Sequence, residues 1–235
     1  MNEYCLYCHE RLDVQLSWFT LMFPPKTSWL CHVCKRKLTR ITGTTCRMCC
    51  RPLENIAAGF VQNDLCLDCV KWERDSNFAD VLVQNISLFA YDDGMKEMLA
   101  RFKFRGDYIL AKLFSDDIKQ ALQTLQFDML VPIPLSKERL AERGFNQAKA
   151  LAVEAGFETS DCLKRIHTEK QSKKTRAERF QLENIFYVND HYDINGKTIL
   201  LVDDIYTTGS TVRHAAYVLR KHGAKKVCAF TLARG

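Results

Sequence analysis

Two adjacent carboxylates and a run of small hydroxyl residues form the strongest chemical pattern in this 235-residue chain. The carboxylates, Asp203 and Asp204, follow four apolar residues at positions 199–202, which predict a buried parallel strand. Residues 212–221 are amphipathic and predict a helix. A tight loop that enters a helix N-terminus predicts a phosphate site, because backbone N–H groups and hydroxyls converge there. The loop between strand and helix supplies five candidate phosphate-binding residues: Thr207, Thr208, Gly209, Ser210 and Thr211.

The acidic pair needs an explanation of its own, because carboxylates repel a neighbouring phosphate. Asp203 and Asp204 make sense if they accept hydrogen bonds from vicinal hydroxyls, as on a ribose, or contact a metal ion that accompanies the phosphate. A ribose 5-phosphate satisfies both requirements, and Gly209 lets the backbone approach its phosphate. The alternative is a buried strand that ends in an acidic turn. Residues 199–211 resemble the signature of type I phosphoribosyltransferases that binds PRPP (5-phosphoribosyl 1-diphosphate). The resemblance implies Asp203 and Asp204 on the ribose hydroxyls.

Eight of the eleven cysteines form four Cys-x-x-Cys pairs within the first 69 residues, and this spacing favours zinc over disulfides. One pair cannot complete a tetrahedral site, so two pairs must combine. Consecutive pairing fits two zinc ribbons, whereas an interleaved arrangement needs longer crossings. Four ligands leave no open position, so both zinc ions are expected to be structural. The expected ligands are Cys5, Cys8, Cys31 and Cys34 at one site, and Cys46, Cys49, Cys66 and Cys69 at the other.

The composition describes a globular protein without a membrane span. Hydrophobic residues make up 47% of the chain, and no run approaches the roughly 20 apolar residues that a span needs. The first residues lack a basic region followed by an apolar stretch, so we expect no signal peptide and a cytoplasmic location. The formal net charge is +6. Each zinc bound by four thiolates carries −2, which brings the loaded protein near +2, so global charge is weak evidence for nucleic-acid binding.

The elements that position these residues follow an α/β pattern. We expect a double zinc ribbon over residues 1–74 and a doubly wound, mainly parallel sheet domain over residues 75–235. Strands are expected within residues 81–91, 128–133, 199–202 and 227–232, with weaker ones near 163–167 and 185–188. Helices are expected after Asp92 or Asp93, over residues 108–125, and from a cap at Ser136 to about residue 155. Residues 164–179 are strongly basic and predict a functional or disordered loop.

Several segments, taken together and in order, look like the ComF family of late competence proteins. They are the double ribbon, KFRGD at 103–107, LVPIPLSKERLAERGFNQA at 130–148, QSKKTRAERFQLEN at 171–184 and VDDIYTTGST at 202–211. The resemblance implies a zinc ribbon fused to a phosphoribosyltransferase-like fold. It also implies a role in bringing transforming single-stranded DNA into the cytoplasm, with a helicase-like ATPase as partner.

The family comparison also suggests where a diphosphate and its Mg²⁺ would lie. The turn after residues 132–134 resembles the pyrophosphate loop, which makes Ser136, Arg139 and Arg143 pyrophosphate candidates; the alternative is that these arginines are solvated helix charges. The basic stretch matches the position of the mobile catalytic loop, although it could equally be an exposed loop without a ligand. Its candidate residues are Lys173, Lys174, Arg176 and Arg179. No side chain stands out as a base or nucleophile.

Three functions remain open from the sequence. The first is a DNA-uptake factor whose pocket and basic surfaces handle single-stranded DNA, for which residues 31–51 offer six Lys or Arg and no acid. The second is an active phosphoribosyltransferase of nucleotide metabolism. The third is a regulator that senses PRPP without turnover.

Overall fold

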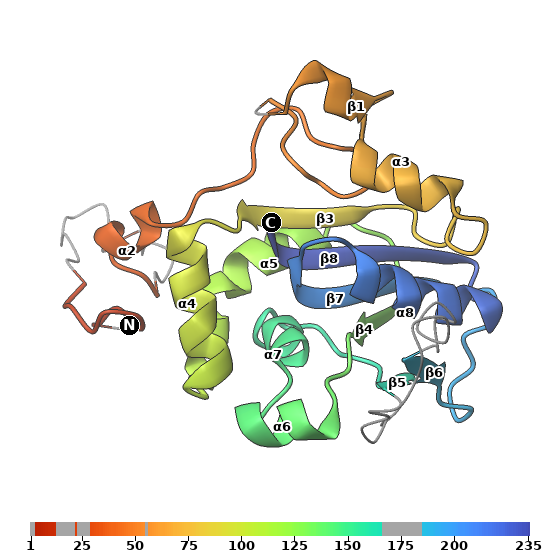
Figure 1. The fold of residues 1–235 in the computed structure, drawn as a ribbon. Coiled ribbons are helices and arrows are strands. Elements are labelled where there is room, and N and C mark those ends of the chain that lie inside the picture. Colours follow the sequence, from red (N-terminus) through yellow and green to blue (C-terminus); the bar gives the residue numbers. More distant parts are fainter. Residues whose placement is uncertain (1–2, 13–21, 23–28, 55, 166–184) are drawn as a thin grey trace, which may run out of the picture.

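A four-stranded parallel sheet forms the centre of the molecule (Figure 1). The computed structural model describes residues 3–12, 22, 29–54, 56–165 and 185–235. The strands are β3 (Asn85–Ala90), β4 (Met129–Pro132), β7 (Thr198–Tyr206) and β8 (Lys226–Arg234), in the spatial order β3-β8-β7-β4. All three neighbouring pairs are parallel. The predicted α/β class with a parallel sheet is confirmed.

Helices cover both faces of this sheet, as expected for a doubly wound fold. On one face, α8 (Ser210–Lys221) packs Ala215 and Leu219 against Leu201 and Ala229. The other face carries buried residues such as Leu200 and Phe230. It is covered by α4 (Asp93–Phe104), the 3-10 helix η2 (Tyr108–Phe114), α5 (Ser115–Leu122) and α7 (Gln147–Glu154).

Two predicted helices prove to be interrupted. Residues 108–125 form η2 followed by α5 rather than one helix. The helix expected from Ser136 to residue 155 divides into α6 (Lys137–Arg143) and α7. Its break has a local cause: Gly144 adopts φ 78°, the left-handed conformation that ends a helix, and the Asn146 side chain then caps α7 by accepting from the Lys149 N–H at 3.1 Å.

A small antiparallel pair stands apart from the main sheet. It consists of β5 (Leu163–Arg165) and β6 (Phe186–Val188), which confirms the two weak strands that the sequence suggested. The basic stretch between them, with Lys173, Lys174, Arg176 and Arg179, lies outside the described residues.

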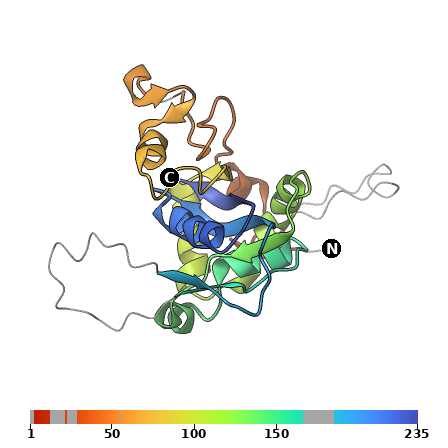
Figure 2. The ribbon, with the colours of Figure 1, turned by 90° about the vertical axis from the view of Figure 1, so that its right-hand side faces the viewer.

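The cysteine-rich segment lies against the sheet domain at two separate places. Its elements are α2 (His32–Arg36), η1 (Ala58–Phe60), β1 (Val61–Gln62), β2 (Leu65–Cys66) and α3 (Leu67–Arg74). Figure 2 shows β1, β2 and α3 as a lobe beyond the β3 edge of the sheet. The apolar contacts of Cys5 and Cys34 belong to the α4 face, whereas those of Cys46 and Cys69 belong to the α8 face. The division at residue 74 stays a prediction.

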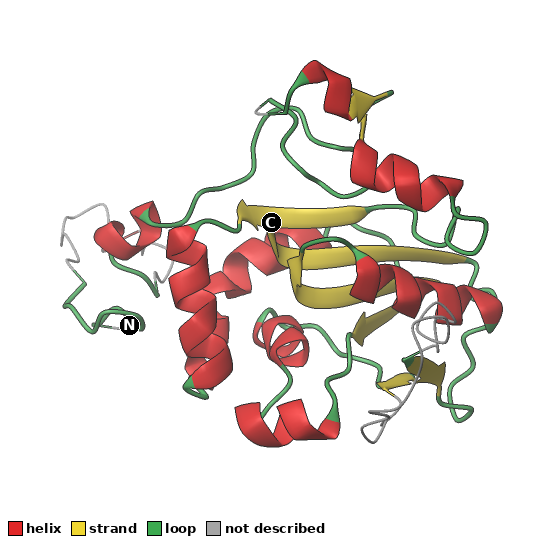
Figure 3. Cartoon of the chain, viewed as in Figure 1, coloured by secondary structure: helices red, strands yellow, loops and turns green. Residues whose placement is uncertain are grey.

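The connection between the two cysteine groups covers the outer edge of β3, and Figure 3 shows it as a loop. Ile41 donates its N–H to the Leu88 carbonyl at 2.9 Å, and Ala90 donates to the Thr39 carbonyl at 2.9 Å. Backbone groups on the β3 edge are thereby paired, which protects it from pairing with other chains. Within the described ranges, the structure holds no helix of the length and apolarity that a bilayer crossing requires.

Candidate functional site

The acidic pair lies where β7 outruns its neighbour β4. The register pairs Pro132, the last residue of β4, with Val202, and β7 continues to Tyr206. Proline cannot extend the ladder as a donor, and a second one at Pro134 follows as the chain leaves the sheet. Asp203 and Asp204 therefore occupy the carboxyl end of β7 beside an open position in the sheet, where ligands bind in α/β folds.

Asp204 is paired with a lysine of the KFRGD segment to which the sequence analysis assigned no role. Lys103, in the last turn of α4, forms an ion pair with the Asp204 carboxylate, and their side chains are only 16% and 13% exposed. Asp203 accepts the Asp204 backbone N–H at 2.9 Å. Burial, together with the Asp204 carboxylate, raises the pKa of Asp203 well above its ordinary value, while Lys103 acts in the opposite direction. The end of β7 thus concentrates negative charge that one lysine partly neutralises.

The predicted phosphate loop follows β7 and leads directly into α8. Gly209 has φ 82° and precedes the helix, and a Cβ at this position would collide with the Tyr206 ring. This contact gives a second reason for glycine besides access to a phosphate. The Thr208 hydroxyl accepts the Ser210 N–H at 3.3 Å, which shapes the turn. Thr207 and Thr208 are exposed, and the first N–H groups of α8 have no partner within the helix.

The candidate pyrophosphate residues lie in and after the turn that follows β4, but they differ in availability. Ser136 caps α6, because its hydroxyl accepts the Arg139 N–H at 3.3 Å. Arg139 is exposed. Arg143 instead donates to Gln147 Oε1 at 2.9 Å, and its guanidinium lies 5.7 Å from the centre of the Phe104 ring. Of the two arginines, Arg139 is the one in position to meet a ligand in the present arrangement.

Arg165, at the end of β5, is a further cation that the sequence analysis did not single out. Its pKa is lowered by burial and by the positive charge of Arg139, while Asp203 works against that shift. Arg165 therefore lies within electrostatic range of both the β7 carboxylates and α6. The only sequence signal was its place at the start of the basic stretch, which did not distinguish it from neighbouring cations.

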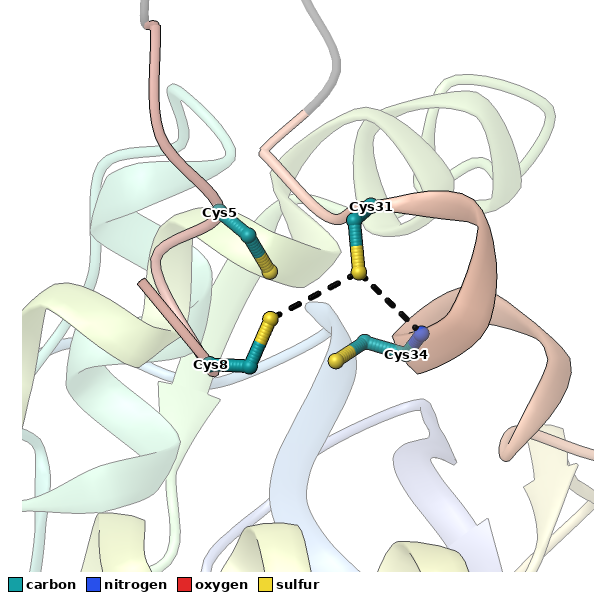
Figure 4. Close-up of side chains that lie close together, drawn as sticks. All are labelled: Cys5, Cys8, Cys31 and Cys34. Carbon is teal, nitrogen blue, oxygen red and sulfur yellow. Dashed lines mark hydrogen bonds between the residues drawn. The ribbon is translucent and has the colours of Figure 1, made fainter. Parts of the chain in front are cut away.

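The cysteines form two four-membered groups, and the consecutive pairing is confirmed. In each group the four Sγ atoms lie within 4.8 Å of one another. Figure 4 shows the first group, in which the sulfur atoms of Cys8 and Cys31 are 3.6 Å apart; those of Cys49 and Cys66 in the second group are also 3.6 Å apart. A tetrahedral zinc with Zn–S bonds of 2.3 Å needs S···S separations of about 3.8 Å, so both groups fit the ion.

The second group is buried as a whole, whereas Cys8 and Cys31 of the first reach the surface. Hydrogen bonds among the thiols lower the pKa of Cys46 and raise those of Cys49 and Cys69, because one thiolate is shared by its neighbours. Neither group includes a histidine among the described residues, and Cys50, beside the second group, donates to the Ser87 carbonyl at 3.5 Å instead. Eight cysteines could thus hold two zinc ions.

A cavity of about 490 Å³ lies beside the contact between α3 and the phosphate loop. Its lining includes Trp72 from α3, and Thr207 and Thr208 from the loop after β7. Arg51, Lys71, Asp68, Asp75 and Gly235 complete it. The cavity therefore places an aromatic ring and both charge signs beside the loop.

Comparisons with known proteins agree with this architecture. Residues 118–235 match the family model described as phosphoribosyl transferase domain, which defines the class of the sheet domain. The chain is 40% identical over 234 residues to "Competence protein ComFC" of Bacillus subtilis (strain 168), covering 98% of this chain and 94% of that protein. It is 34% identical over 231 residues to "Competence protein ComFC" of Streptococcus pneumoniae (strain ATCC BAA-255 / R6), covering 98% and 99%.

A more distant relative carries a different name. The chain is 27% identical over 238 residues to "DNA utilization protein YhgH" of Escherichia coli (strain K12), covering 93% of this chain and 96% of that protein. The chain belongs to the ComF family of competence and DNA-utilization proteins, with a phosphoribosyltransferase-like domain.

Proposed function

We propose that the chain binds PRPP or a closely related phosphoribosyl ligand, with Mg²⁺, at the end of β7. The observation that supports this most strongly is that both halves of the site lie at one strand end. Only two residues of β7 separate Asp203 and Asp204 from the loop that leads into α8. A ribose 5-phosphate needs hydroxyl acceptors on one side and anion donors on the other, and this strand end offers both.

Each residue then has a physical role. The carboxylates of Asp203 and Asp204 accept hydrogen bonds from the ribose hydroxyls, and residues 207–211 surround the 5-phosphate. Ser136, Arg139 and Arg143 would contact the diphosphate, whose charge a bound Mg²⁺ would partly neutralise. Arg165 adds positive charge on that side. Lys103 pairs with Asp204 and holds its carboxylate in place, and the remaining lone pairs of that carboxylate are available to a ribose hydroxyl.

Calorimetric titration with PRPP and Mg²⁺ tests the proposal. Replacing both aspartates, Asp203→Asn with Asp204→Asn, keeps side-chain size but removes the charge and half of the acceptor capacity. Charge-assisted hydrogen bonds contribute about 1.5–3 kcal/mol each, so PRPP affinity should fall by roughly two to four decades. Unchanged affinity in the folded double variant would show that the sugar does not bind at the end of β7.

We further propose that the protein handles incoming single-stranded DNA in the cytoplasm, together with a helicase-like ATPase. Relatives named for competence and DNA utilization support this role. Lys35 and Arg36 are exposed on α2, directly after Cys34 of the first cysteine group, and could contact phosphates. Pairing of cysteines as metal ligands rather than disulfides is in keeping with a reducing compartment.

Single-stranded DNA should bind without strong sequence preference, and its affinity should fall steeply with salt, because Lys and Arg contacts to phosphate release counterions. Changing Lys173, Lys174 and Arg176 to Ala should lower both the affinity and the salt slope. Binding that is unaffected by this triple change would leave Lys35, Arg36 and Lys37 as the main DNA contact. Salt-independent binding of the wild-type chain would contradict the proposal.

An active phosphoribosyltransferase is the second candidate, and the cavity beside the phosphate loop favours it. That space of about 490 Å³ could admit an acceptor next to a bound sugar. The reaction would be attack on C1 of PRPP with loss of pyrophosphate. PRPP-dependent pyrophosphate release, measured with candidate nucleobases or DNA as acceptor, separates this enzyme from a DNA-uptake factor or a regulator that only senses PRPP.

A further inference from the structure

The carbonyl of Thr208 in the phosphate loop accepts a hydrogen bond from α3, the helix that carries Cys69 of the second cysteine group. Trp72 Nε1, on α3, donates to the Thr208 carbonyl oxygen at 2.9 Å. In a planar trans peptide the C=O and the following N–H point in opposite directions. A carbonyl fixed toward α3 therefore directs the Gly209 N–H away from α3. One hydrogen bond from the lobe thus sets the orientation of a peptide unit that the proposed phosphate needs as a donor.

A second connection joins the same helix to the first turn of α8. Arg213 is fully buried, and its Nη1 donates to Glu73 Oε1 at 2.7 Å. The Arg213 guanidinium also lies 5.4 Å from the centre of the Trp72 ring. Glu73 and Trp72 are adjacent on α3, so the carboxylate and the ring both contact Arg213 of α8. Removing α3 would leave this buried charge without its partner.

A third connection reaches a metal ligand itself. Arg234, at the end of β8, is buried, and its Nε donates to the Cys49 carbonyl at 3.0 Å while Nη2 contacts Cys49 Sγ at 3.4 Å. Its Nη1 donates to the Tyr206 carbonyl at 3.1 Å. Tyr206 is the residue immediately before the phosphate loop. A single guanidinium therefore links a sulfur ligand of the second group to the start of the loop.

The first cysteine group is connected elsewhere. Arg101 of α4 donates to the Tyr7 carbonyl at 2.6 Å, and the same guanidinium lies 4.7 Å from the centre of the Tyr7 ring. The Leu6 N–H donates to the Trp29 carbonyl at 3.0 Å within the first group's own segments, and Lys37 forms an ion pair with Glu97 of α4. The two groups consequently offer an internal comparison within one molecule.

We propose that the second cysteine group, when it holds its metal, positions the phosphate loop, with Trp72 as the positioning residue. Metal occupancy of that group and binding of the phosphoribosyl ligand then stabilise each other, because coupling between two sites is reciprocal. The first cysteine group has no such contact with the loop and reaches the site only through α4, whose Lys103 pairs with Asp204, so its coupling to the ligand should be much weaker. The inference rests on the proposed function, since it names what holds that site in its binding geometry.

The test uses the full chain loaded with two zinc ions. A zinc-selective chelator is added with and without saturating PRPP and Mg²⁺, and zinc release is followed while calorimetry measures PRPP binding to the same sample. PRPP should slow release of one zinc by roughly fivefold or more, and change release of the other by about twofold at most. Trp72→Phe keeps an aromatic ring but lacks the N–H. It should retain both zinc ions, bind PRPP roughly five- to tenfold more weakly, and lose the protection of that zinc.

Trp29→Phe is the matched control, because Trp29 lies two positions before Cys31 in the first cysteine group. This variant should keep both PRPP affinity and zinc protection. PRPP that binds without changing either zinc release rate overturns the inference alone, and so does a Trp72→Phe variant with wild-type affinity and protection. A wild-type chain that binds no PRPP in the calorimeter overturns the proposed function and this inference with it.

Discussion

The two cysteine groups share their ligand chemistry and differ in almost everything around it. The first has two surface cysteines and packs on α4, on the face of the sheet away from α8. All four cysteines of the second are buried, and its lobe is hydrogen-bonded to the loop after β7 through Trp72 and to Tyr206 through Arg234. Similar spacing therefore yields one group at the surface and one that belongs to the candidate site.

On the proposed coupling, a zinc ion bound by the second group would support both its own segment and the phosphate loop. A lobe without its metal would hardly hold a core of its own, because so small a segment buries too little apolar surface. For the first group, that loss should affect α2 and its exposed basic residues. For the second, it should also reach the phosphate loop. The predictions below test whether the two groups can be separated in this way.

The largest expected contrast comes from removing one equivalent ligand from each group. Cys31 and Cys66 both immediately precede a helix, α2 and α3 respectively. Either change, Cys31→Ser or Cys66→Ser, should lower the metal content from two zinc ions to about one, because a tetrahedral site loses most of its affinity with three ligands. Cys66→Ser should weaken PRPP binding by roughly tenfold or more, and Cys31→Ser by about twofold at most.

Elemental analysis and calorimetry on the same preparations measure both quantities. A metal count near one in the wild-type chain would contradict the two-site assignment. Equal losses of PRPP affinity in the two variants would contradict the separation of the groups.

The next contrast concerns one arginine from each region. Arg234→Met removes the donors to the Cys49 carbonyl and Cys49 Sγ and one of the two donors to the Tyr206 carbonyl, which keeps the Gly235 N–H at 3.0 Å. It should cost about 2–3 kcal/mol of unfolding free energy. Arg40→Met breaks an ion pair with Asp117 that is 49% and 28% exposed, and it should cost at most about 1 kcal/mol. Urea unfolding measures both, and similar costs would show that the Arg234 contacts contribute little.

A measurement of DNA affinity tests which region of the protein binds single-stranded DNA. Changing the exposed Lys35 and Arg36 to Ala should reduce single-strand affinity a few-fold and flatten its salt dependence, because two phosphate contacts are lost. PRPP affinity should stay unchanged, since these residues belong to the first group. A loss of PRPP binding in this variant would contradict the division of labour between the two regions.

The smallest effect is expected from the pH dependence of stability. The pKa of Asp203 is raised above its ordinary value of 3.8, so the folded chain binds this proton more tightly than the unfolded chain does. Stability should therefore fall as pH rises from that value through the folded pKa. Asp203→Asn cannot ionise and removes this loss. Its Tm relative to wild type should rise between about pH 4 and pH 7, whereas a constant difference would assign Asp203 an ordinary pKa.

Local features of this fold could be predicted from the sequence. Cysteine pairs, the acidic strand end and the glycine before α8 each depend on residues close together in the chain, so spacing was sufficient. The α6–α7 break was also signalled, by Gly144 and Asn146, yet the sequence analysis extended one helix from the cap at Ser136 to about residue 155. Turn chemistry was the better guide at that position.

Contacts between distant segments could not be predicted in the same way. Lys103 meets Asp204, Trp72 meets Thr208, and Arg234 meets Cys49 only after the sheet has brought their elements together. A lysine at the end of a helix, or an arginine at the end of a strand, gives no sign of its partner in sequence. Burial of Arg213 and Arg234 was likewise invisible, because arginine is usually exposed.

A crystal structure of the full chain at saturating PRPP and Mg²⁺ tests the central claim most directly. The account predicts the ribose hydroxyls within hydrogen-bond distance of Asp203 and Asp204, with the 5-phosphate in the loop of residues 207–211. Intact PRPP there would favour a binding role, and a cleaved sugar at the same place would favour an enzyme. PRPP bound elsewhere, or an ordered loop that stays empty at saturation, would contradict the account.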